Sequence, residues 1–348
     1  MKIRYLSEND INSHGLLDID ESLSVMEKMF ECIKQNDYKM GGINGNSHGN
    51  RMFFDYNEKK NLYISMPGYL GGEFNNVGIK WHGPNIRGIL GGETKHMLIL
   101  NDVNSGYPKG VISATTLTTY RTAAVSLYAV KKLKKKNIEC VGIVGPGNIN
   151  TIFLKGLVNL LGEIPKIKVK GRSVKGLNTF EEKLMNQGIP IERVDTLEEC
   201  VSESDIISVA TGFEFDTISD MPIIRDKWIK KNALILCPSY IKFSDEMIVS
   251  RSYNTVDNMK MYMSYKDELG YPVYKSLSNL GNRYVDLITD EKLKLTDVHN
   301  IFEINSENVP DDKTLLFCSG GMVVEDIALG TMVLNKAENN NVGTLLEF

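Results

Sequence analysis

A lysine inside an apolar stretch is the first residue with notable chemistry. Lys80 lies in the segment Val77–Trp81, directly between Ile79 and Trp81. We expect these neighbours to remove water from the amine and to lower its pKa toward a useful range. An amine tuned in this way can move protons and orient a water molecule. Lys80 is therefore the candidate catalytic residue, and a lysine on an exposed strand face is the alternative.

Two arginines are candidates for binding substrate carboxylates, because a guanidinium can hold a carboxylate through two parallel N–H bonds. Arg121 begins the run Arg121–Ala124, and Arg51 follows a segment rich in glycine and asparagine. For Arg51 a surface position in a loop is the alternative. Arg87 and His82 are weaker candidates, and for His82 a surface or packing role is favoured.

A glycine turn after a short apolar run is typical of dinucleotide binding. Cys140–Val144 is apolar enough for a buried strand, and a helical pattern begins near Asn150. Gly145 would allow the tight turn, and Gly147 would let the backbone approach a pyrophosphate. The helix N-terminus would offer free N–H groups to the phosphates. We therefore expect a cofactor at Gly145, Gly147, Asn148 and Ile149. Asn150 replaces the third glycine of the pattern, so a glycine turn in another α/β protein is the alternative.

The residues after the next predicted strand bear on the choice of cofactor. NAD-binding proteins commonly have an acid about 20 residues beyond the glycines, which binds the ribose 2′-hydroxyl. This chain instead has Gly171-Arg172-Ser173 after Lys166–Lys170. Arg172 and Ser173 would suit the 2′-phosphate of NADP, and stacking of Arg172 on adenine is the alternative. The choice between NAD and NADP stays open.

Residues 137–318 alternate strand and helix patterns, which predicts right-handed crossovers and a Rossmann-type, doubly wound parallel sheet. The predicted strands are Cys140–Val144, Lys166–Lys170, Ile206–Ala210, Ala233–Leu236, Thr255–Val256 and Leu315–Phe317. The predicted helices are Asn148–Leu161, Val174–Asn186, Leu197–Glu203 and Asn258–Leu269. Thr211, Ser239 and Gly320 follow strands, where ligands bind in open α/β sheets, and we expect them to contact the cofactor.

The remainder of the chain predicts a second, α+β domain for substrate binding and dimerisation. A strand at Ile3–Leu6 and an amphipathic helix at Asp18–Lys34 precede several β-type runs between residues 41 and 112. A helix is expected at Ala114–Lys136 and another at Met322–Ala337, which should return the chain to the first domain. The predicted domains are 1–122 with 322–348, and 123–321.

Composition excludes several classes of function. The 348 residues are 42% hydrophobic and 24% charged, which indicates a globular protein. A net charge of −4 argues against nucleic acid as the main partner. No apolar run reaches the roughly 18 residues of a membrane span, and the N-terminus lacks a signal-peptide core. The five scattered cysteines indicate free, buried thiols in a reducing cytoplasm, and the cysteine and histidine spacings suggest no metal site.

Taken together, the motifs resemble the ornithine cyclodeaminase/μ-crystallin family from end to end of the chain. The matching segments are Met66-Pro67, Gly78-Ile79-Lys80-Trp81, Leu100-Asn101-Asp102, Tyr120-Arg121-Thr122-Ala123-Ala124, Gly145-Pro146-Gly147-Asn148-Ile149 and Gly321-Met322-Val323-Val324-Glu325-Asp326. The resemblance implies an amino-acid substrate bound at Arg51, Met66, Lys80 and Arg121. It also implies that Arg121 and Thr122 contact an NAD or NADP cofactor, and that the protein forms a homodimer through the sheet of the first domain.

Within that family, the run Met66–Gly83 is most similar to members that oxidise N-(2-amino-2-carboxyethyl)-L-glutamate with NAD in siderophore biosynthesis. These members hydrolyse the resulting imine to 2-oxoglutarate and L-2,3-diaminopropionate. Ornithine cyclodeaminases and alanine dehydrogenases carry an aspartate after the strand that corresponds to Ala233–Leu236, and this chain has Tyr240 there. The missing carboxylate argues against ornithine cyclisation. Ornithine cyclodeaminase, ketimine reductase or alanine dehydrogenase, and a non-enzymatic binding protein remain the alternatives.

Overall fold

The computed structural model describes residues 2–56, 59–83, 94–134, 138–211, 218 and 221–348. The chain divides into two compact units. Unit 1 comprises Met1–Arg121 and Met322–Phe348, and unit 2 comprises Thr122–Gly321. The first boundary falls inside the long helix α3 (Thr115–Leu133), and the second falls just before helix α10 (Val323–Asn339).

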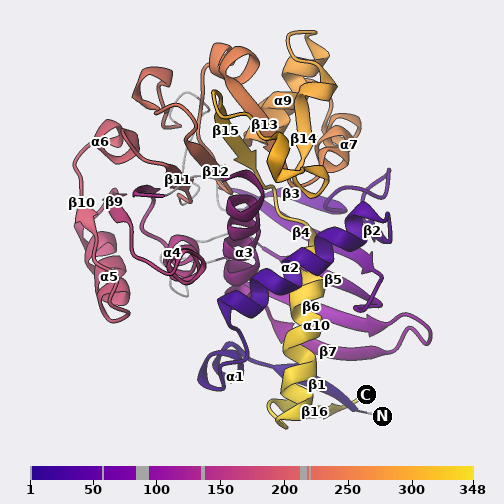
Figure 1. Cartoon of the computed structure of the whole chain (residues 1–348). Helices are drawn as coiled ribbons and strands as arrows, with labels where there is room; N and C mark the ends of the chain where they lie inside the picture. Colours follow the sequence, from indigo (N-terminus) through magenta and orange to yellow (C-terminus); the bar gives the residue numbers. More distant parts are fainter. Residues whose placement is uncertain (1, 57–58, 84–93, 135–137, 212–217, 219–220) are drawn as a thin grey trace. The chain divides into compact units, whose positions relative to one another are not determined.

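Unit 1 is built on one sheet with helices on one of its faces (Figure 1). Its strands are β1 (Lys2–Leu6), β2 (Tyr38–Met40), β3 (Asn50–Tyr56), β4 (Lys59–Leu70), β5 (Asn76–His82), β6 (His96–Asp102), β7 (Pro108–Ser113) and β16 (Thr344–Glu347). They are ordered β16-β1-β7-β6-β5-β4-β2, with β3 paired to β4. The pairs are antiparallel except for β1 with β7, which confirms the prediction of a mostly antiparallel sheet.

Side chains alternate between the two faces of this sheet, as a strand requires. On β5 the even-numbered residues Asn76, Gly78 and Lys80 are buried, whereas Val77 and Trp81 are exposed. Helix α10 packs on β4, β5 and β6 and on helix α2 (Ile19–Lys34), so it covers the even-numbered face. We call this the inner face and the opposite side the outer face.

The helices of unit 1 begin where polar side chains satisfy their first N–H groups. Ser7 and Asp10 form a reciprocal capping box at α1 (Glu8–Ser13). Asp18 caps α2, where the sequence predicted the helix to start. The cap of α3 comes from elsewhere in the unit, because the Glu8 carboxylate accepts hydrogen bonds from the N–H groups of Thr115 and Thr116.

Unit 2 is a parallel sheet with helices, which confirms the predicted Rossmann-type fold. Its strands are β8 (Cys140–Val144), β9 (Lys166–Lys170), β10 (Glu192–Arg193), β11 (Ile206–Val209), β12 (Leu234–Cys237), β13 (Ser252–Val256), β14 (Val298–Asn300) and β15 (Thr314–Cys318). The order is β10-β9-β8-β11-β12-β15-β13-β14, and every pair is parallel. The strand order reverses between β8 and β11, which is where open α/β sheets bind ligands.

The helices of unit 2 connect these strands. They are α4 (Asn148–Leu161), α5 (Val174–Met185), α6 (Leu197–Val201), α7 (Met259–Leu269), α8 (Val273–Ser276) and α9 (Leu280–Thr289). Helix α4 spans the residues that the sequence predicted, and α5, α6 and α7 lie within a few residues of their predicted ends. The sequence analysis did not predict β10, β14, α8 or α9, nor β2 and β16 in unit 1.

Three general features can be stated for the described residues. All five cysteines are free and buried, as predicted. Among the described residues, no helix is long and apolar enough to cross a membrane. In the same part of the chain, no group of three or more His, Cys, Asp or Glu side chains is arranged to hold a metal ion.

Candidate active site

Lys80 lies on the inner face of β5, with only 2% of its surface exposed. Its Nζ donates a hydrogen bond to Asp326 Oδ2 over 2.5 Å. Burial lowers the pKa of Lys80, although the Asp326 carboxylate opposes this shift. The predicted direction and its predicted cause, desolvation, are therefore confirmed, but the groups that enclose the amine differ from those predicted. Ile79 and Trp81 lie on the outer face, and what surrounds the amine is the inner-face core together with charged groups from α10 and α3.

Two neighbouring acids in the first turn of α10 complete a charged cluster. Arg121 Nη1 donates to Glu325 Oε2 over 2.8 Å, and Arg121 Nε lies 3.5 Å from Asp326 Oδ1. Neither carboxylate is exposed to solvent. Acids at this end of a helix interact favourably with its dipole. Lys80, Arg121, Glu325 and Asp326 together form what we call the ion-pair cluster.

The cluster keeps Asp326 ionised inside the protein. Burial by itself raises the pKa of Asp326, but Lys80 and Arg121 outweigh this effect and hold the pKa below its ordinary value. Thr118 Oγ1 also donates to Asp326 Oδ1, over 3.3 Å. Two cations and two carboxylates balance each other, so the cluster carries no net charge when all four are ionised. Removing four charged groups from water is costly, so a buried cluster of this kind adds little to the stability of the fold. A functional role explains the cluster better than a stabilising role does.

Two further predicted substrate residues lie on the same face of the sheet. Met66 on β4 is buried and directly opposite Lys80 in the β4–β5 register. Arg51 on β3 pairs with Ile64, which in turn pairs with His82. The structure therefore brings Arg51, Met66 and Lys80 onto one face of one sheet. Arg87 lies outside the described residues.

His82 and His96 form a neighbouring pair on the inner face. They are direct partners in the β5–β6 register, with ring centroids 5.0 Å apart. Burial, and then the charge of Lys80, lower the pKa of His82 to about 4 and that of His96 to about 2. Both imidazoles are therefore neutral near pH 7.

The glycine turn in unit 2 has the geometry that a dinucleotide requires. Gly145 has φ +100°, and a Cβ there would lie 2.4 Å from the carbonyl oxygen of Ala210, so a side chain cannot be accommodated. Next to Gly147 the space is open, and the nearest atom to a Cβ would be the same oxygen at 3.9 Å. Helix α4 begins there without a side-chain cap. These residues fit a pyrophosphate bound at Gly145, Gly147, Asn148 and Ile149.

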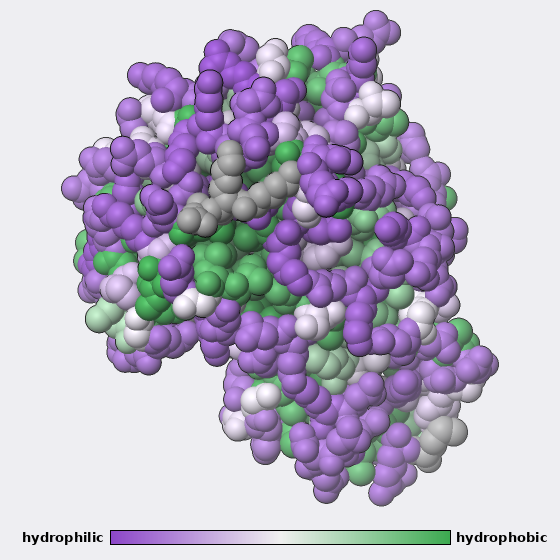
Figure 2. Space-filling view, viewed as in Figure 1, coloured by the Kyte–Doolittle hydropathy of each residue, from purple (hydrophilic) through white to green (hydrophobic). Residues whose placement is uncertain are grey.

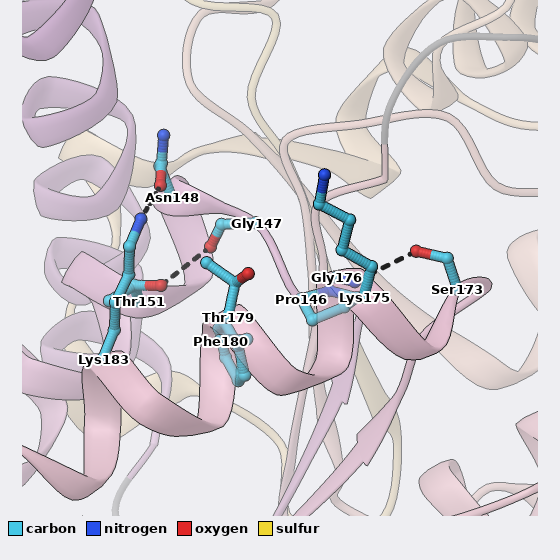
Figure 3. A pocket seen from close by; sticks show the side chains of 10 residues that line it. All are labelled: Pro146, Gly147, Asn148, Thr151, Ser173, Lys175, Gly176, Thr179, Phe180 and Lys183. Carbon is cyan, nitrogen blue, oxygen red and sulfur yellow. Dashed lines mark hydrogen bonds between the residues drawn. The ribbon is translucent and has the colours of Figure 1, made fainter. Parts of the chain in front are cut away.

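A pocket of about 330 Å³ lies beside this turn, between the start of α4 and helix α5 (Figure 3). Lys183 Nζ donates to Asn148 Oδ1 across the pocket, over 3.0 Å. Ser173 caps α5, because its Oγ accepts from the N–H of Gly176. Arg172 is exposed and precedes that cap. The described residues that line the pocket include two lysines and no acid: Pro146, Gly147, Asn148, Thr151, Ser173, Lys175, Gly176, Thr179, Phe180 and Lys183.

The remaining predicted cofactor residues lie at the ends of strands or on α3. Thr211 and Ser239 follow β11 and β12 and are joined, because Ser239 Oγ donates to the Thr211 carbonyl over 2.9 Å. Gly320 follows β15, and its N–H donates to the buried carboxylate of Asp257 over 2.8 Å. Thr122 is buried on α3. Tyr240 is partly buried in the segment after β12.

Comparison with known proteins identifies the family. The model of the ornithine cyclodeaminase/mu-crystallin family matches residues 17–341. The chain belongs to this family. A similar curated relative is the N-((2S)-2-amino-2-carboxyethyl)-L-glutamate dehydrogenase of Staphylococcus aureus, 26% identical over 295 residues that cover 81% of each chain.

Solved structures of similar fold cover the whole length of the chain. An archaeal alanine dehydrogenase dimer with bound NAD has a TM-score of 0.77 and 20% identity, and the match covers 100% of both chains. The Δ¹-pyrroline-2-carboxylate reductase of Thermococcus litoralis, in complex with NADH and L-proline, has a TM-score of 0.78 and 22% identity. That match covers 98% of this chain and 99% of the other.

Sequence reasoning missed four members of this site: Glu325, Asp326, Thr118 and His96. Glu325 and Asp326 were part of a segment that resembled the family, but they received no role. The signal that could have identified them is a pair of adjacent acids inside an otherwise apolar helical run. Such a run predicts a buried helix, and buried carboxylates are rarely found without a partner. Thr118 and His96 carry no comparable signal, since only the register of the sheet and the packing of α3 bring them to Lys80.

Proposed function

We propose that this member of the ornithine cyclodeaminase/mu-crystallin family is an NAD(P)-dependent dehydrogenase of a secondary amine such as N-(2-amino-2-carboxyethyl)-L-glutamate. It hydrolyses the resulting imine to 2-oxoglutarate and L-2,3-diaminopropionate. The observation that carries the proposal is the buried Lys80–Asp326 pair, a proton-handling group beside Arg121. Relatives named as dehydrogenases and reductases, and neighbours with bound NAD or NADH, support the oxidoreductase class and the nicotinamide cofactor.

The reaction divides into an oxidation and a hydrolysis. When bound, a nicotinamide cofactor accepts a hydride from the carbon that carries the amine, while the amine nitrogen loses a proton. Carbon and nitrogen are then joined by a double bond. Water adds to that carbon, and the carbon–nitrogen bond breaks to give a ketone and a primary amine. One water molecule is consumed, and one NAD(P)H and one proton are released.

Lys80 and Asp326 manage the protons in both stages. A lysine with a lowered pKa gives up its proton more readily than an ordinary lysine, which suits it to general acid–base catalysis. Asp326 holds the amine by a 2.5 Å hydrogen bond and stabilises its charged form. Lys80 therefore receives the proton of the attacking water and returns one to the departing nitrogen.

Arg121 binds the carboxylate next to the reacting carbon. Glu325 fixes the direction of its guanidinium, because the ion pair between them is buried and 2.8 Å long. The Glu8 carboxylate fixes the first turn of α3, which carries Arg121 two turns further on. A preorganised cation of this kind orients the substrate without the entropy cost of ordering a free side chain.

The segment after β12 favours amine oxidation over ornithine cyclisation. The sequence places Tyr240 where cyclodeaminases carry an aspartate for the substrate amine, and the partly buried tyrosine has no carboxylate to offer. The relative from Staphylococcus aureus, named for a secondary-amine dehydrogenase activity, supports the same choice.

The test is to incubate the protein with N-(2-amino-2-carboxyethyl)-L-glutamate and either NAD⁺ or NADP⁺. We expect NAD(P)H, 2-oxoglutarate and L-2,3-diaminopropionate in equal amounts, measured by absorbance and chromatography. Proline and ammonia from L-ornithine without net NAD(P)H would instead identify a cyclodeaminase. Oxidation of L-proline or L-alanine would identify an imine reductase or an alanine dehydrogenase.

We also propose that the protein is a homodimer formed through the outer face of the unit 1 sheet. Three aromatic rings form a row on that face: Phe54 stacks on Tyr63 with ring centroids 5.8 Å apart, and Trp81 is tilted against Tyr63 with centroids 5.6 Å apart. Met97 continues the row. Phe54, Trp81 and Met97 are each more than 40% exposed. Hydrophilic residues predominate on the side that Figure 2 shows, where α10 covers the inner face. A second copy would cover the apolar row, and the dimeric neighbour supports this occupant.

The five cysteines support a cytoplasmic location for the enzyme. All are free, buried thiols in the structure. Proteins of oxidising compartments commonly use cysteines as disulfides.

A further inference from the structure

The ion-pair cluster does not by itself supply charge for a substrate with several carboxylates. Its two cations are matched by two buried carboxylates, Glu325 and Asp326. Each further acid group on the substrate therefore needs donors from outside the cluster. The inner face provides such donors one step along the sheet from Lys80.

His82 and His96 occupy that next row. On β5, His82 is two residues beyond Lys80 and on the same face, and its partner across the ladder is His96. The Nδ1 atom of each ring is buried and makes no hydrogen bond of standard geometry with the described residues, although the backbone of Gly83 lies close enough to the His82 ring to raise its pKa. A buried ring nitrogen without a partner costs free energy, so this pair is prepared for a group that the described residues do not provide. Arg51 lies in the same row, through Ile64.

The electrostatic surroundings select the sign of that group. Although the ion-pair cluster carries no net charge, Lys80 disfavours protonation of both imidazoles more than Asp326 favours it, and Arg121 adds to the effect of Lys80. The same positive field repels the ammonium group of a basic amino acid and attracts a carboxylate. Neutral imidazoles can donate N–H bonds to that carboxylate without bringing a further buried charge that needs a partner.

We propose that His82 and His96 form a subsite that binds a second carboxylate of the substrate, at the end of an arm beyond the reacting carbon. The site is thus specific for acidic amino acids and their 2-oxo-acid products, and it excludes basic and purely aliphatic ones. This inference rests on the proposed function and adds the residues that recognise the acidic arm.

The test compares two 2-oxo acids that differ only in that arm. 2-Oxoglutarate carries the distal carboxylate, and 2-oxopentanoate ends in a methyl group at the same chain length. Reductive coupling of each to L-2,3-diaminopropionate is followed by NAD(P)H consumption. We expect the wild type to prefer 2-oxoglutarate. His82→Leu and His96→Leu should raise its KM on the order of 10- to 100-fold, with kcat changed much less and with 2-oxopentanoate unaffected.

Conservative variants separate binding from folding. His82→Gln and His96→Gln keep an N–H donor and should recover a large part of the preference. His299→Leu in unit 2, where the ring stacks on Tyr253, is the matched control and should leave the preference unchanged. Equal losses with both oxo acids, or unchanged KM values in the leucine variants, would overturn the subsite.

Calorimetry distinguishes this inference from the proposed reaction. Binding of 2-oxoglutarate and of 2-oxopentanoate is measured with NAD(P)⁺ present, where no turnover occurs. If 2-oxoglutarate binds preferentially and His82→Leu abolishes that preference, the subsite stands even if no coupling is detected. If coupling occurs but the wild type binds both acids equally, the reaction stands and the subsite is wrong.

Discussion

The charge states of Lys80 and Asp326 depend on the opposite charges that are buried with them in the ion-pair cluster. Lys80 and Asp326 are almost inaccessible to water, so Asp326 is stabilised in its charged form by Lys80 and Arg121, whereas charged Lys80 is stabilised mainly by Asp326 and is opposed by Arg121. Removing one member leaves its partner buried and uncompensated, which costs roughly 3 to 5 kcal/mol in proteins. Stability and activity must therefore be measured together in any variant of this cluster.

Lys80→Met tests the catalytic role while keeping the length of the side chain. We expect kcat to fall by about 100-fold or more, since a proton-transferring group is lost, and cofactor affinity to stay near that of the wild type. The variant should also unfold at lower urea concentration. Adding Asp326→Asn should recover stability without recovering kcat. Turnover retained in Lys80→Met would assign the proton chemistry to another group.

Arg172→Ala tests which nicotinamide cofactor the protein prefers. Arg172 is exposed, and the described residues of the adjoining pocket include no acid to bind a ribose 2′-hydroxyl. We expect the variant to weaken NADPH binding more than NADH binding, because a 2′-phosphate is held by cations. Fluorescence titration with both cofactors measures this ratio, and Arg251→Ala, at a half-exposed arginine directly before β13, is the control. If the variant weakened NADPH and NADH binding equally, Arg172 would only stack on the adenine that both cofactors share.

At the scale of elements, local patterns predicted those helices and strands that carry a strong signal of their own. Helix α4 was predicted to the residue because an apolar helical stripe follows directly after a glycine turn. The strand β16 was missed because its four residues are all exposed and show no alternation. Its position is set by pairing with β1, which lies more than 300 residues earlier. Helix α8 and strand β14 were missed because four and three residues are too few to show a period. Helix α9 has ten residues with apolar side chains on one side, so its helical pattern was present in the sequence and was overlooked.

In the candidate site, too, only residues with a strong local signal could be predicted from the sequence. Lys80, Arg121 and the glycine turn could be predicted, because each is a distinctive residue type in a distinctive local setting. His96 could not, since its relation to Lys80 exists only in the β5–β6 register. Desolvation of Lys80 was predicted correctly, but the residues that cause it were not, for a related reason. Sequence neighbours on a strand point to opposite faces, so Ile79 and Trp81 do not share its environment.

Gly147→Val tests the junction of β8 and α4 as a phosphate site. The glycine has φ −112°, which valine adopts readily, and a Cβ there meets no protein atom closer than 3.9 Å. We therefore expect the thermal midpoint to change little. Cofactor affinity should fall by at least about 10-fold, because the new methyl groups occupy the space beside the helix N-terminus. Normal affinity in this variant would place the pyrophosphate elsewhere.

At the scale of the whole molecule, the outer face of the sheet predicts self-association. Met97→Glu puts a charge into the apolar row and should give a monomer in light scattering at concentrations where the wild type is a dimer. Leu295→Glu changes an equally exposed apolar residue in unit 2 and should have no effect. A wild-type monomer, or a dimer in the Met97 variant, would contradict this interface.

The two neutral histidines predict how stability depends on pH. Their folded-state pKa values are about 4 for His82 and about 2 for His96, below the ordinary value of 6.5. Between these values the unfolded chain binds protons that the folded protein does not. The free energy of unfolding should therefore fall as the pH drops from about 6.5 to about 4. Urea titrations across that range should show a smaller fall in His82→Gln, whereas His14→Gln, at an exposed histidine, should follow the wild type.

Strand β5 serves two purposes through alternate residues, since Lys80 faces α10 and Trp81 faces away from it. Any change that loosens or shifts this strand acts on both sides at once. A substitution chosen to make the protein more soluble, such as a polar residue in place of Trp81, would be made one peptide bond from the reactive amine. A change of the outer surface can therefore also change turnover. If such a variant loses activity, a shift of the β5 backbone must be tested before the loss is attributed to the loss of the second subunit.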